Sequence, residues 1–454
     1  MSHRTPATLE PGPALPGDVR QQLARTGNLE TPWVWVTLAA ASVLALTGLV
    51  WWCRRQELAG WWRWARLVAG GLAVLLLATG AVGAGINSYV GYFPTLRSFA
   101  AYVAGSRSGG LGGAGAAVPG GYRSRVVVDQ VGAPALGVRP GRLYVYLPPG
   151  YDDPGNTSRR YPVVYLVHGF PGRAADWFTA GQAGRAMDVL LGRHLVPPMI
   201  LASPDAAAGR GLYDSECLDA VDGPAEGTFL TGTVVSYVDS HYRTVADRSA
   251  RAIGGMSSGG YCALNLGLRH TDRYSVILSS EPYGDPGRVG YSHLAWRRSL
   301  MAANTPSGYI RTMRFLHRMA VMLDAPGGDP ADVSRARELG LALAARGQQV
   351  AFRVEAGQSH TWHAARAGLP YLLAFAGAHL RARYPVPSPH AWEVGCETHF
   401  TVGPGTTPGR EPGRGDPGRG TRPAGRGGVL GSDDGRGGRP CPGWQGDHLP
   451  AVAG

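Results

Sequence analysis

Residues 250–268 read ARAIGGMSSGGYCALNLGL, and this stretch indicates the fold more clearly than any other part of the chain. It contains G-x-S-x-G at residues 255–259, preceded by the apolar run 250–253 and followed at 261–268 by a helix-like segment. A strand, a sharp turn and a helix in this order are typical of a nucleophile elbow. Residues without bulk beside the serine let the two backbones approach each other. The stretch predicts Ser257 as a nucleophile, the alternative being a Gly-Ser loop with no chemistry.

Apolar, strand-like runs recur on both sides of this stretch. Helical segments separate most of the later runs, whereas the first two are joined tightly, as antiparallel edge strands are. This alternation predicts an α/β domain over residues 122–384, with a mostly parallel sheet covered by helices on both faces. The expected strands are 124–128, 142–147, 163–167, 199–202, 250–256, 276–279, 321–323 and 350–354.

Two long uncharged segments precede this domain, at residues 31–53 and 67–87. About 20 apolar residues span a bilayer as a helix. Tryptophan pairs lie near both ends of the first segment, as they do at membrane interfaces. The segments therefore predict two transmembrane helices, the alternative being a buried hairpin in the core of the protein.

The loop between these segments carries four arginines and one acidic residue. The positive-inside rule places this loop in the cytoplasm and the domain outside, although three arginines before residue 31 oppose that assignment in part. In a second interpretation, the apolar run is a signal peptide with a small-residue cleavage site at residues 81–84. Both interpretations predict an extracytoplasmic domain at a bacterial cell membrane.

Composition excludes some classes of function and structure. The net charge of +12 comes from arginine alone and is spread without a basic run, which indicates a GC-rich genome rather than a nucleic-acid site. Disorder is expected for the polar N-terminus 1–30 and the Gly/Pro/Arg-rich tail 385–454, and residues 104–121 read as a flexible linker.

The five cysteines show no metal-binding spacing, so neither a metal nor a cofactor is expected. Cys217 and Cys262 both fall within the domain. An exported domain permits a disulfide between them, and two unpaired thiols are the alternative.

A serine nucleophile needs a base within hydrogen-bond reach and an acid that orients the base. His360, on a loop after the last expected strand, is the predicted base, and His363 is the second choice. Asp329, at the tip of a glycine-rich turn, is the preferred acid. Asp324, at the end of a strand, and Glu281, after another strand, are the alternatives.

The tetrahedral intermediate of acyl transfer requires an oxyanion hole. The backbone N–H of Ser258, which follows the nucleophile, is one expected donor. The second is the N–H of Phe170, in the loop 168–172 after an apolar strand, where His168 is expected to be structural.

Five runs of sequence resemble one family. The resemblance covers about residues 122–382, and its motifs are LYVYLPPGYDD (143–153), YPVVYLVHGFPG (161–172), YDSEC (213–217), the run 237–277 and EAGQSHTW (355–362). They look like the Putative esterase family of α/β-hydrolases, which includes esterase D (S-formylglutathione hydrolase) and the antigen 85 mycolyltransferases. The resemblance implies Ser257 as nucleophile and His360 as base, and the turn 327–329 is similar to the family's G-x-x-D acid loop.

The expected function is that of a membrane-tethered serine esterase, similar to membrane-anchored esterase-like proteins of high-GC Gram-positive bacteria. It hydrolyses a carboxylic ester through an acyl-enzyme. One alternative is an acyltransferase that acts on cell-envelope glycolipids, in the manner of the antigen 85 group. A second is a non-catalytic envelope-binding protein with the same fold.

Overall fold

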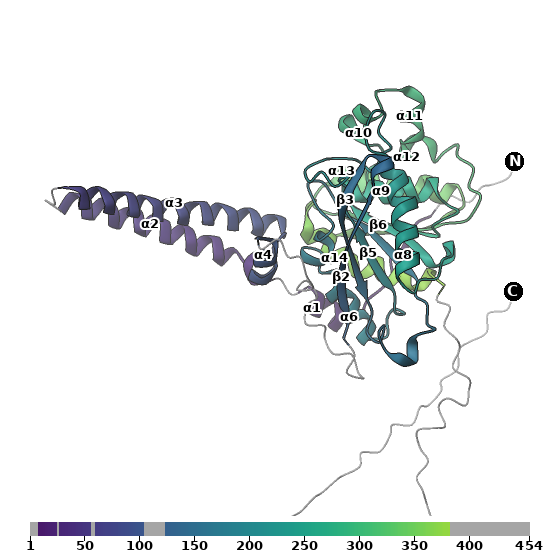
Figure 1. Ribbon diagram of the computed structural model, residues 1–454, viewed down its shortest axis with the longest axis horizontal. Coiled ribbons are helices and arrows are strands. Elements are labelled where there is room, and N and C mark those ends of the chain that lie inside the picture. The colour runs from purple at the N-terminus through teal and green to yellow at the C-terminus, as the bar shows by residue number, and fades with distance from the viewer. Residues whose placement is uncertain (1–7, 25–26, 56–59, 104–122, 382–454) are drawn as a thin grey trace, which may run out of the picture. The chain divides into compact units, whose positions relative to one another are not determined.

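The computed structural model describes residues 8–24, 27–55, 60–103 and 123–381 (Figure 1). The expected linker 104–121 and the expected tail 385–454 lie outside the described residues.

Nine strands of the described chain form one sheet, and the eight strands expected from the sequence are all among them. The strands are β1 Glu10–Pro11, β2 Arg125–Ala133, β3 Val138–Leu147, β4 Val163–Val167, β5 Ile200–Pro204, β6 Arg251–Met256, β7 Val276–Ser280, β8 Ala320–Pro326 and β9 Gln349–Glu355. Their order is β1-β9-β8-β7-β6-β4-β5-β3-β2. The β2–β3 and β3–β5 pairs are antiparallel and the others are parallel. This is the α/β-hydrolase fold.

Helices cover both faces of the sheet (Figure 1). The α-helices of the described residues are α1 Gly17–Leu23, α2 Pro32–Arg55, α3 Trp61–Val90, α4 Leu96–Val103, α5 Asp176–Thr179, α6 Ala183–Gly192, α7 Glu226–Thr228, α8 Val235–His241, α9 Ser258–Arg269, α10 Gly287–His293, α11 Arg298–Ala303, α12 Pro306–Tyr309, α13 Pro330–Ala345 and α14 Trp362–His379.

Alternate side chains of each strand point to opposite faces of the sheet. In β4, Val164 and Leu166 face a core shared with α6 and α14, whereas Val163 and Tyr165 face a core shared with α8, α9 and α13. Both sets are buried, which is why β4 is apolar throughout rather than alternating.

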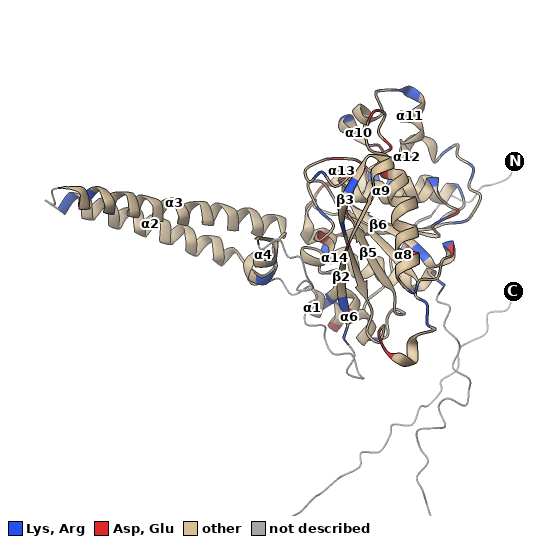
Figure 2. Ribbon diagram, viewed as in Figure 1, with Lys and Arg blue, Asp and Glu red and all other residues tan. Residues whose placement is uncertain are grey.

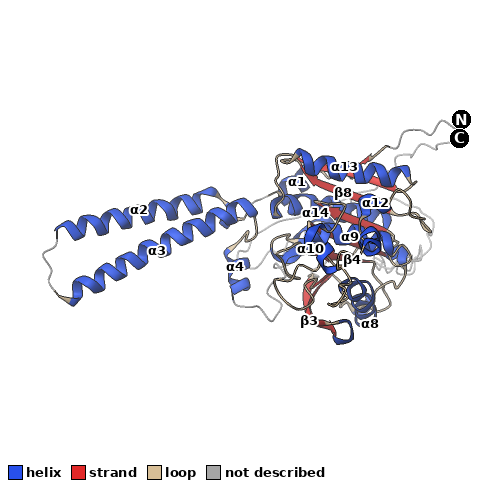
Figure 3. Cartoon of the chain, turned by 90° about the horizontal axis from the view of Figure 1, so that it is seen from above, coloured by secondary structure: helices blue, strands red, loops and turns tan. Residues whose placement is uncertain are grey.

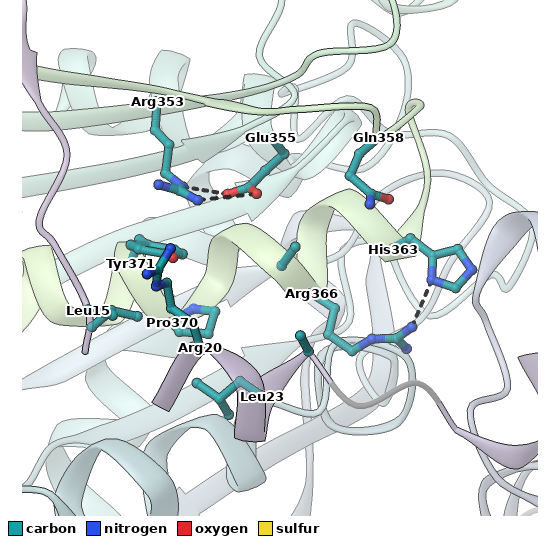
Figure 4. A pocket seen from close by; sticks show the side chains of 12 residues that line it. Leu15, Arg20, Leu23, Arg353, Glu355, Gln358, His363, Arg366, Pro370 and Tyr371 are labelled. Atoms are coloured by element: carbon teal, nitrogen blue, oxygen red, sulfur yellow. Dashed lines mark hydrogen bonds and ion pairs between the residues drawn. The ribbon is translucent and has the colours of Figure 1, made fainter. Parts of the chain in front are cut away.

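Part of the N-terminus is ordered, which corrects the expectation of disorder over residues 1–30. β1 pairs with β9 in parallel, and Leu15 and Val19 are buried against the α6–α14 core. Composition misses this segment because it is polar and short, and only contact with the domain makes its two apolar side chains stabilising. The segment also lines a pocket with α14 (Figure 4).

α2 and α3 lie side by side as an antiparallel pair (Figure 3). Both are long and apolar enough to cross a membrane, and they extend beyond the expected spans 31–53 and 67–87. Their large apolar side chains are exposed, including Trp33 at 74% and Leu44 at 71%. The pair is therefore not a buried core hairpin. Arginines lie at its turn (Figure 2).

Candidate active site

Ser257 lies on a sharp turn between β6 and α9. Its φ of 55° and ψ of −121° are unusual for a residue with a side chain. Its N–H donates to the carbonyl of Ser280 at the end of β7 (3.1 Å), and its carbonyl accepts from Tyr261 in α9 (2.9 Å). This is the geometry of the nucleophile elbow that the motif predicts.

Close backbone contacts require glycine at both ends of the motif and at the next residue, Gly260. A Cβ added to Gly255 would lie 2.1 Å from the carbonyl oxygen of Gly259. A Cβ on Gly259 would lie 2.2 Å from the carbonyl oxygen of Val167, and one on Gly260 would lie 2.4 Å from that of Ser280. Any side chain at these positions would push α9 away from β4 and β7.

The loop 168–172 lies against the elbow. A Cβ on Gly169 would be 2.7 Å from Sδ of Met256 and 3.4 Å from Cβ of Ser257. Phe170 follows, and Ser258 opens α9, where the first amides of a helix have no partner within the helix. Both N–H groups thus belong to segments beside Ser257, as an oxyanion hole requires.

His168 is structural. Its Nε2 accepts from the N–H of Ala206 (3.0 Å), so its proton lies on Nδ1, 2.8 Å from the carbonyl oxygen of Gly169. The ring is buried, and its bond to Ala206 joins the loop after β4 to the loop after β5.

His360 lies between β9 and α14, with a carboxylate beside each ring nitrogen. Nε2 is 3.1 Å from Oε2 of Glu281, and Nδ1 is 3.5 Å from Oδ2 of Asp332. The Glu281 side chain is 1% exposed, and burial together with the nearby charge of Asp324 raises its pKa well above the usual range. Asp332 is shared with Arg335, one turn along α13.

The structure places Glu281 beside His360, whereas the side chain of Asp329, the preferred acid, bonds elsewhere. Asp329 is the N-cap of α13: its Oδ1 accepts from the N–H of Ala331 (2.8 Å), and Pro330 opens the helix. The Gly327-Gly328 turn has another role. Its amides donate to the carbonyls of Glu355 and Gln358, which holds the loop after β8 against the loop of His360.

The other two alternatives, Asp324 and His363, contact other partners. Asp324 is buried, and its Oδ1 lies 4.0 Å from Nε of Arg353. Burial and the nearby charge of Glu355 raise the pKa of Asp324. His363 directs Nε2 to the carbonyl of Ser88 (3.1 Å) and lies beside Arg366 (Figure 4).

Cys217 and Cys262 form a disulfide, which joins the loop after β5 to α9.

Glu216, next to Cys217 in the chain, is a residue that the sequence did not single out. Both oxygens of Glu216 accept from the hydroxyl of Tyr283 (2.8 Å). Burial and Asp214 raise the pKa of Glu216 to about 8, while hydrogen bonds from Tyr283 and Ser258 lower it. A carboxyl that is neutral at pH 7 thus lies next to an expected oxyanion donor.

Ser257 and His360 line one cavity of about 710 Å³, together with Phe170 and the rest of the loop after β4. Among the described residues, no group of three or more His, Cys, Asp or Glu side chains is arranged to hold a metal ion. The cavity thus brings together a serine on a strained turn, a histidine that lies 3.1 Å from a buried carboxyl group, and the loop of Phe170.

Comparison with known proteins gives the family. The model of the family described as Putative esterase matches residues 137–368, just over half of the chain. The chain belongs to this family. The site described above, from the oxyanion loop to His360, falls within the matched residues.

Several proteins that are similar to this chain are also esterases. Esterase Rv1288 of Mycobacterium tuberculosis is 31% identical over 156 residues, which are 34% of this chain and 31% of that protein. The Endo-1,4-beta-xylanase/feruloyl esterase of Xylanibacter ruminicola is 30% identical over 161 residues, 32% of this chain and 21% of that protein. The chain therefore matches a third or less of the length of these relatives. A solved ferulic acid esterase is 26% identical, with a TM-score of 0.50, over 57% of this chain and 100% of that chain.

Proposed function

We propose that this chain is a membrane-tethered, extracytoplasmic serine esterase with Ser257 as nucleophile, His360 as base and Glu281 as the acid. One observation carries the proposal: Ser257, on its strained turn, shares a cavity with a histidine that is paired with a buried carboxylate. Glu281 replaces Asp329 because the buried carboxyl group of Glu281 lies 3.1 Å from the ring of His360, whereas Asp329 caps a helix.

In the first half of the reaction, Oγ of Ser257 attacks the ester carbonyl carbon while His360 takes the hydroxyl proton. This transfer requires the imidazole to turn one nitrogen toward Ser257 while the other stays on the acid. The charge on the former carbonyl oxygen is stabilised by the N–H groups of Phe170 and Ser258. The C–O bond to the alcohol then breaks, and the leaving alkoxide takes the proton from His360.

In the second half, His360 takes a proton from water, which attacks the acyl-enzyme. The tetrahedral intermediate collapses, the bond to Ser257 breaks, and Oγ takes the proton back from His360. A sugar hydroxyl in place of water gives acyl transfer by the same steps. Product analysis with a sugar acceptor separates the two reactions, because only transfer yields an acylated sugar.

Membrane tethering is supported by α2 and α3, whose apolar side chains are exposed along both helices. At the turn, Arg55 stacks over Trp51 (4.5 Å) and Arg66 lies over Trp52 (5.9 Å), pairs suited to a membrane interface. Because β1 pairs with β9, the segment before α2 and the domain after α3 belong on one side of the membrane. The positive-inside rule then favours the outer side for both.

A fluorophosphonate probe tests the catalytic proposal on the full chain in detergent micelles. We expect covalent labelling and hydrolysis of p-nitrophenyl acetate, both lost in Ser257→Ala. The matched control is Ser292→Ala, which removes an exposed serine of α10 and is expected to change neither. Absence of labelling in the unmodified chain, or equal labelling of Ser257→Ala, would favour the non-catalytic alternative.

Topology is tested separately with phosphatase fusions in a bacterial host. A fusion after residue 120 is expected to be active, because the phosphatase folds only outside the cytoplasm, and a fusion within residues 56–59 is expected to be inactive. The reverse pattern would contradict an extracytoplasmic site.

A further inference from the structure

The cavity that contains Ser257 has two walls. One is formed by the catalytic domain, with the loop after β4, Met256 and the residues around His360. The other is formed by the end of α3, the connection to α4, and α4 itself. Most side chains of this second wall are apolar: Ile86, Val90, Phe93, Phe99, Tyr102 and Val103. The cavity is open to solvent on one side, and its volume of about 710 Å³ lies in the range typical of small-molecule sites.

Specific contacts hold the second wall against the domain. The hydroxyl of Tyr92 donates to Oδ1 of Asp176 (2.5 Å), a side chain that is 1% exposed. The guanidinium of Arg173 lies 3.6 Å from the ring centre of Tyr102 in a cation–π contact. Oδ2 of Asp176 also accepts from the backbone N–H of Arg173 (2.8 Å), so Tyr92 adds a second donor, and this bond favours contact between the second wall and the domain.

A second group of contacts joins the same region to α14, the helix that begins directly after His360. Arg366 pairs with the buried Glu30 (2.7 Å) and donates to the carbonyl of Gly91 (3.2 Å). His363 contacts the carbonyl of Ser88 (3.1 Å). The ends of both long helices are therefore attached beside the catalytic histidine.

Resting on the function proposed above, we infer that the wall formed by residues 86–103 binds the acyl chain of an amphipathic lipid ester, which Ser257 receives from the membrane. α3 is one of the two proposed spans and ends at Val90, within the cavity lining. Ile86, also in that lining, is 61% exposed. Apolar side chains of the span thus also line the cavity, with Asn87 between Ile86 and Val90 as the polar member of that lining.

The apolar lining between α3 and Ser257 favours an ester with a long acyl chain. An acyl chain that moves along Ile86 and Phe99 to Ser257 stays in contact with apolar groups, so little apolar area is exposed to water on the way. On the domain side the path is bordered by Phe170 and Leu212, which are 42% and 83% exposed. A short acyl group reaches Ser257 without touching the second wall and gains nothing from it.

The test compares p-nitrophenyl decanoate with p-nitrophenyl acetate on the full chain in lipid nanodiscs. Phe99→Ala is expected to lower the ratio of kcat/KM for decanoate to that for acetate about tenfold, the effect of losing part of the burial of a Phe ring. Val103→Trp, which adds bulk at an exposed position of the same wall, is expected to lower the same ratio. Leu96→Ala is the control, because Leu96 is an exposed residue of α4 outside the cavity lining.

The outcomes separate this inference from the proposed function. An unchanged ratio in both wall variants overturns the acyl-binding wall, as does an equal loss for the two esters, which indicates a structural role only. A wild-type chain that hydrolyses acetate but not decanoate also overturns it while leaving the esterase intact. A wild-type chain that neither hydrolyses acetate nor takes the fluorophosphonate label overturns the proposed function itself.

Discussion

The serine side and the histidine side of the site are built in different ways. On the serine side, β6, the turn at Ser257 and α9 are consecutive in the chain, and backbone contacts at three glycines fix them. On the histidine side, His360 follows β9, Glu281 follows β7 and Asp332 lies in α13 after β8.

The difference determines how each side tolerates change. The elbow is a single local unit, so one added methyl group displaces it. The base and its carboxylates come from three separate connections of a parallel sheet, whose strand ends share one edge, so more than one acidic residue can reach His360. We expect substitutions on the serine side to abolish activity, and substitutions of the carboxyl groups on the histidine side to lower activity by amounts that differ from residue to residue.

The largest effect is expected for Gly259→Ala. The new Cβ would lie 2.2 Å from the carbonyl oxygen of Val167, so α9 must shift and Ser257 with it. We expect no measurable hydrolysis of p-nitrophenyl acetate and a lower melting temperature. Gly192→Ala in α6 is the control, because nothing lies within 4 Å of its added Cβ. Retained activity in Gly259→Ala would mean that the elbow is less constrained than its backbone contacts imply.

The next effect distinguishes the two carboxylates beside His360. Glu281→Gln is expected to lower kcat about 10²–10⁴-fold, because the amide cannot become negatively charged beside the imidazolium that forms during the reaction. Asp332→Asn is expected to lower kcat less than about tenfold, since Asp332 is shared with Arg335 and lies farther from the ring. A larger loss in Asp332→Asn than in Glu281→Gln would reassign the acid.

A smaller effect concerns pH. Glu216, with a pKa of about 8, is neutral at pH 7 and charged at pH 9, and the charge would oppose the developing oxyanion near Ser258. We expect kcat/KM of the wild type to fall by roughly threefold to tenfold from pH 7 to pH 9, and Glu216→Gln to remove most of that fall. A pH profile that is identical in the variant would exclude this role.

The same group affects stability. The unfolded chain releases the Glu216 proton near pH 4.5, whereas the folded chain keeps it until about pH 8. The folded state therefore binds more protons in that window, and the free energy of unfolding falls as pH rises through it. Melting temperatures of wild type and Glu216→Gln, measured from pH 5 to pH 9, are expected to converge at the acidic end and diverge above it.

The smallest effect on activity is expected for Asp329→Ala. Loss of the N-cap of α13 costs about 1 kcal/mol of stability, but kcat/KM is expected to stay within about twofold because the side chain bonds to Ala331 rather than His360. Denaturant unfolding and p-nitrophenyl acetate kinetics measure both quantities. A loss as large as that of Glu281→Gln would restore Asp329 as the acid.

Much of the fold was predictable because its signals are local. The eight expected strands are apolar runs bounded by turns, and residues 250–268 contain strand, turn and helix in one stretch. The two long helices were predicted from uncharged length alone. The cap at Asp329 also had a local signal, since Asp before Pro is a frequent helix start, but the glycine-rich turn favoured Asp329 as the acid instead.

The remaining features depend on contacts between distant residues. β1 forms only because β9, more than 300 residues away, offers an edge, and Leu15 and Val19 are stabilising only against the α6–α14 core. The hydrogen bond between Tyr92 and Asp176 joins residues that are 84 positions apart, and no sequence pattern around either residue predicts it.

By itself, the sequence determined the serine elbow, the order of strands along the chain and the two apolar spans, because each depends on neighbouring residues and the period of their side chains. Only the tertiary structure decided which carboxyl groups lie beside His360, that Cys217 pairs with Cys262, and that the end of α3 lines the cavity of Ser257. The physical reason is that side chains from separate connections meet according to how strand ends and helices pack, and packing is a property of the whole chain.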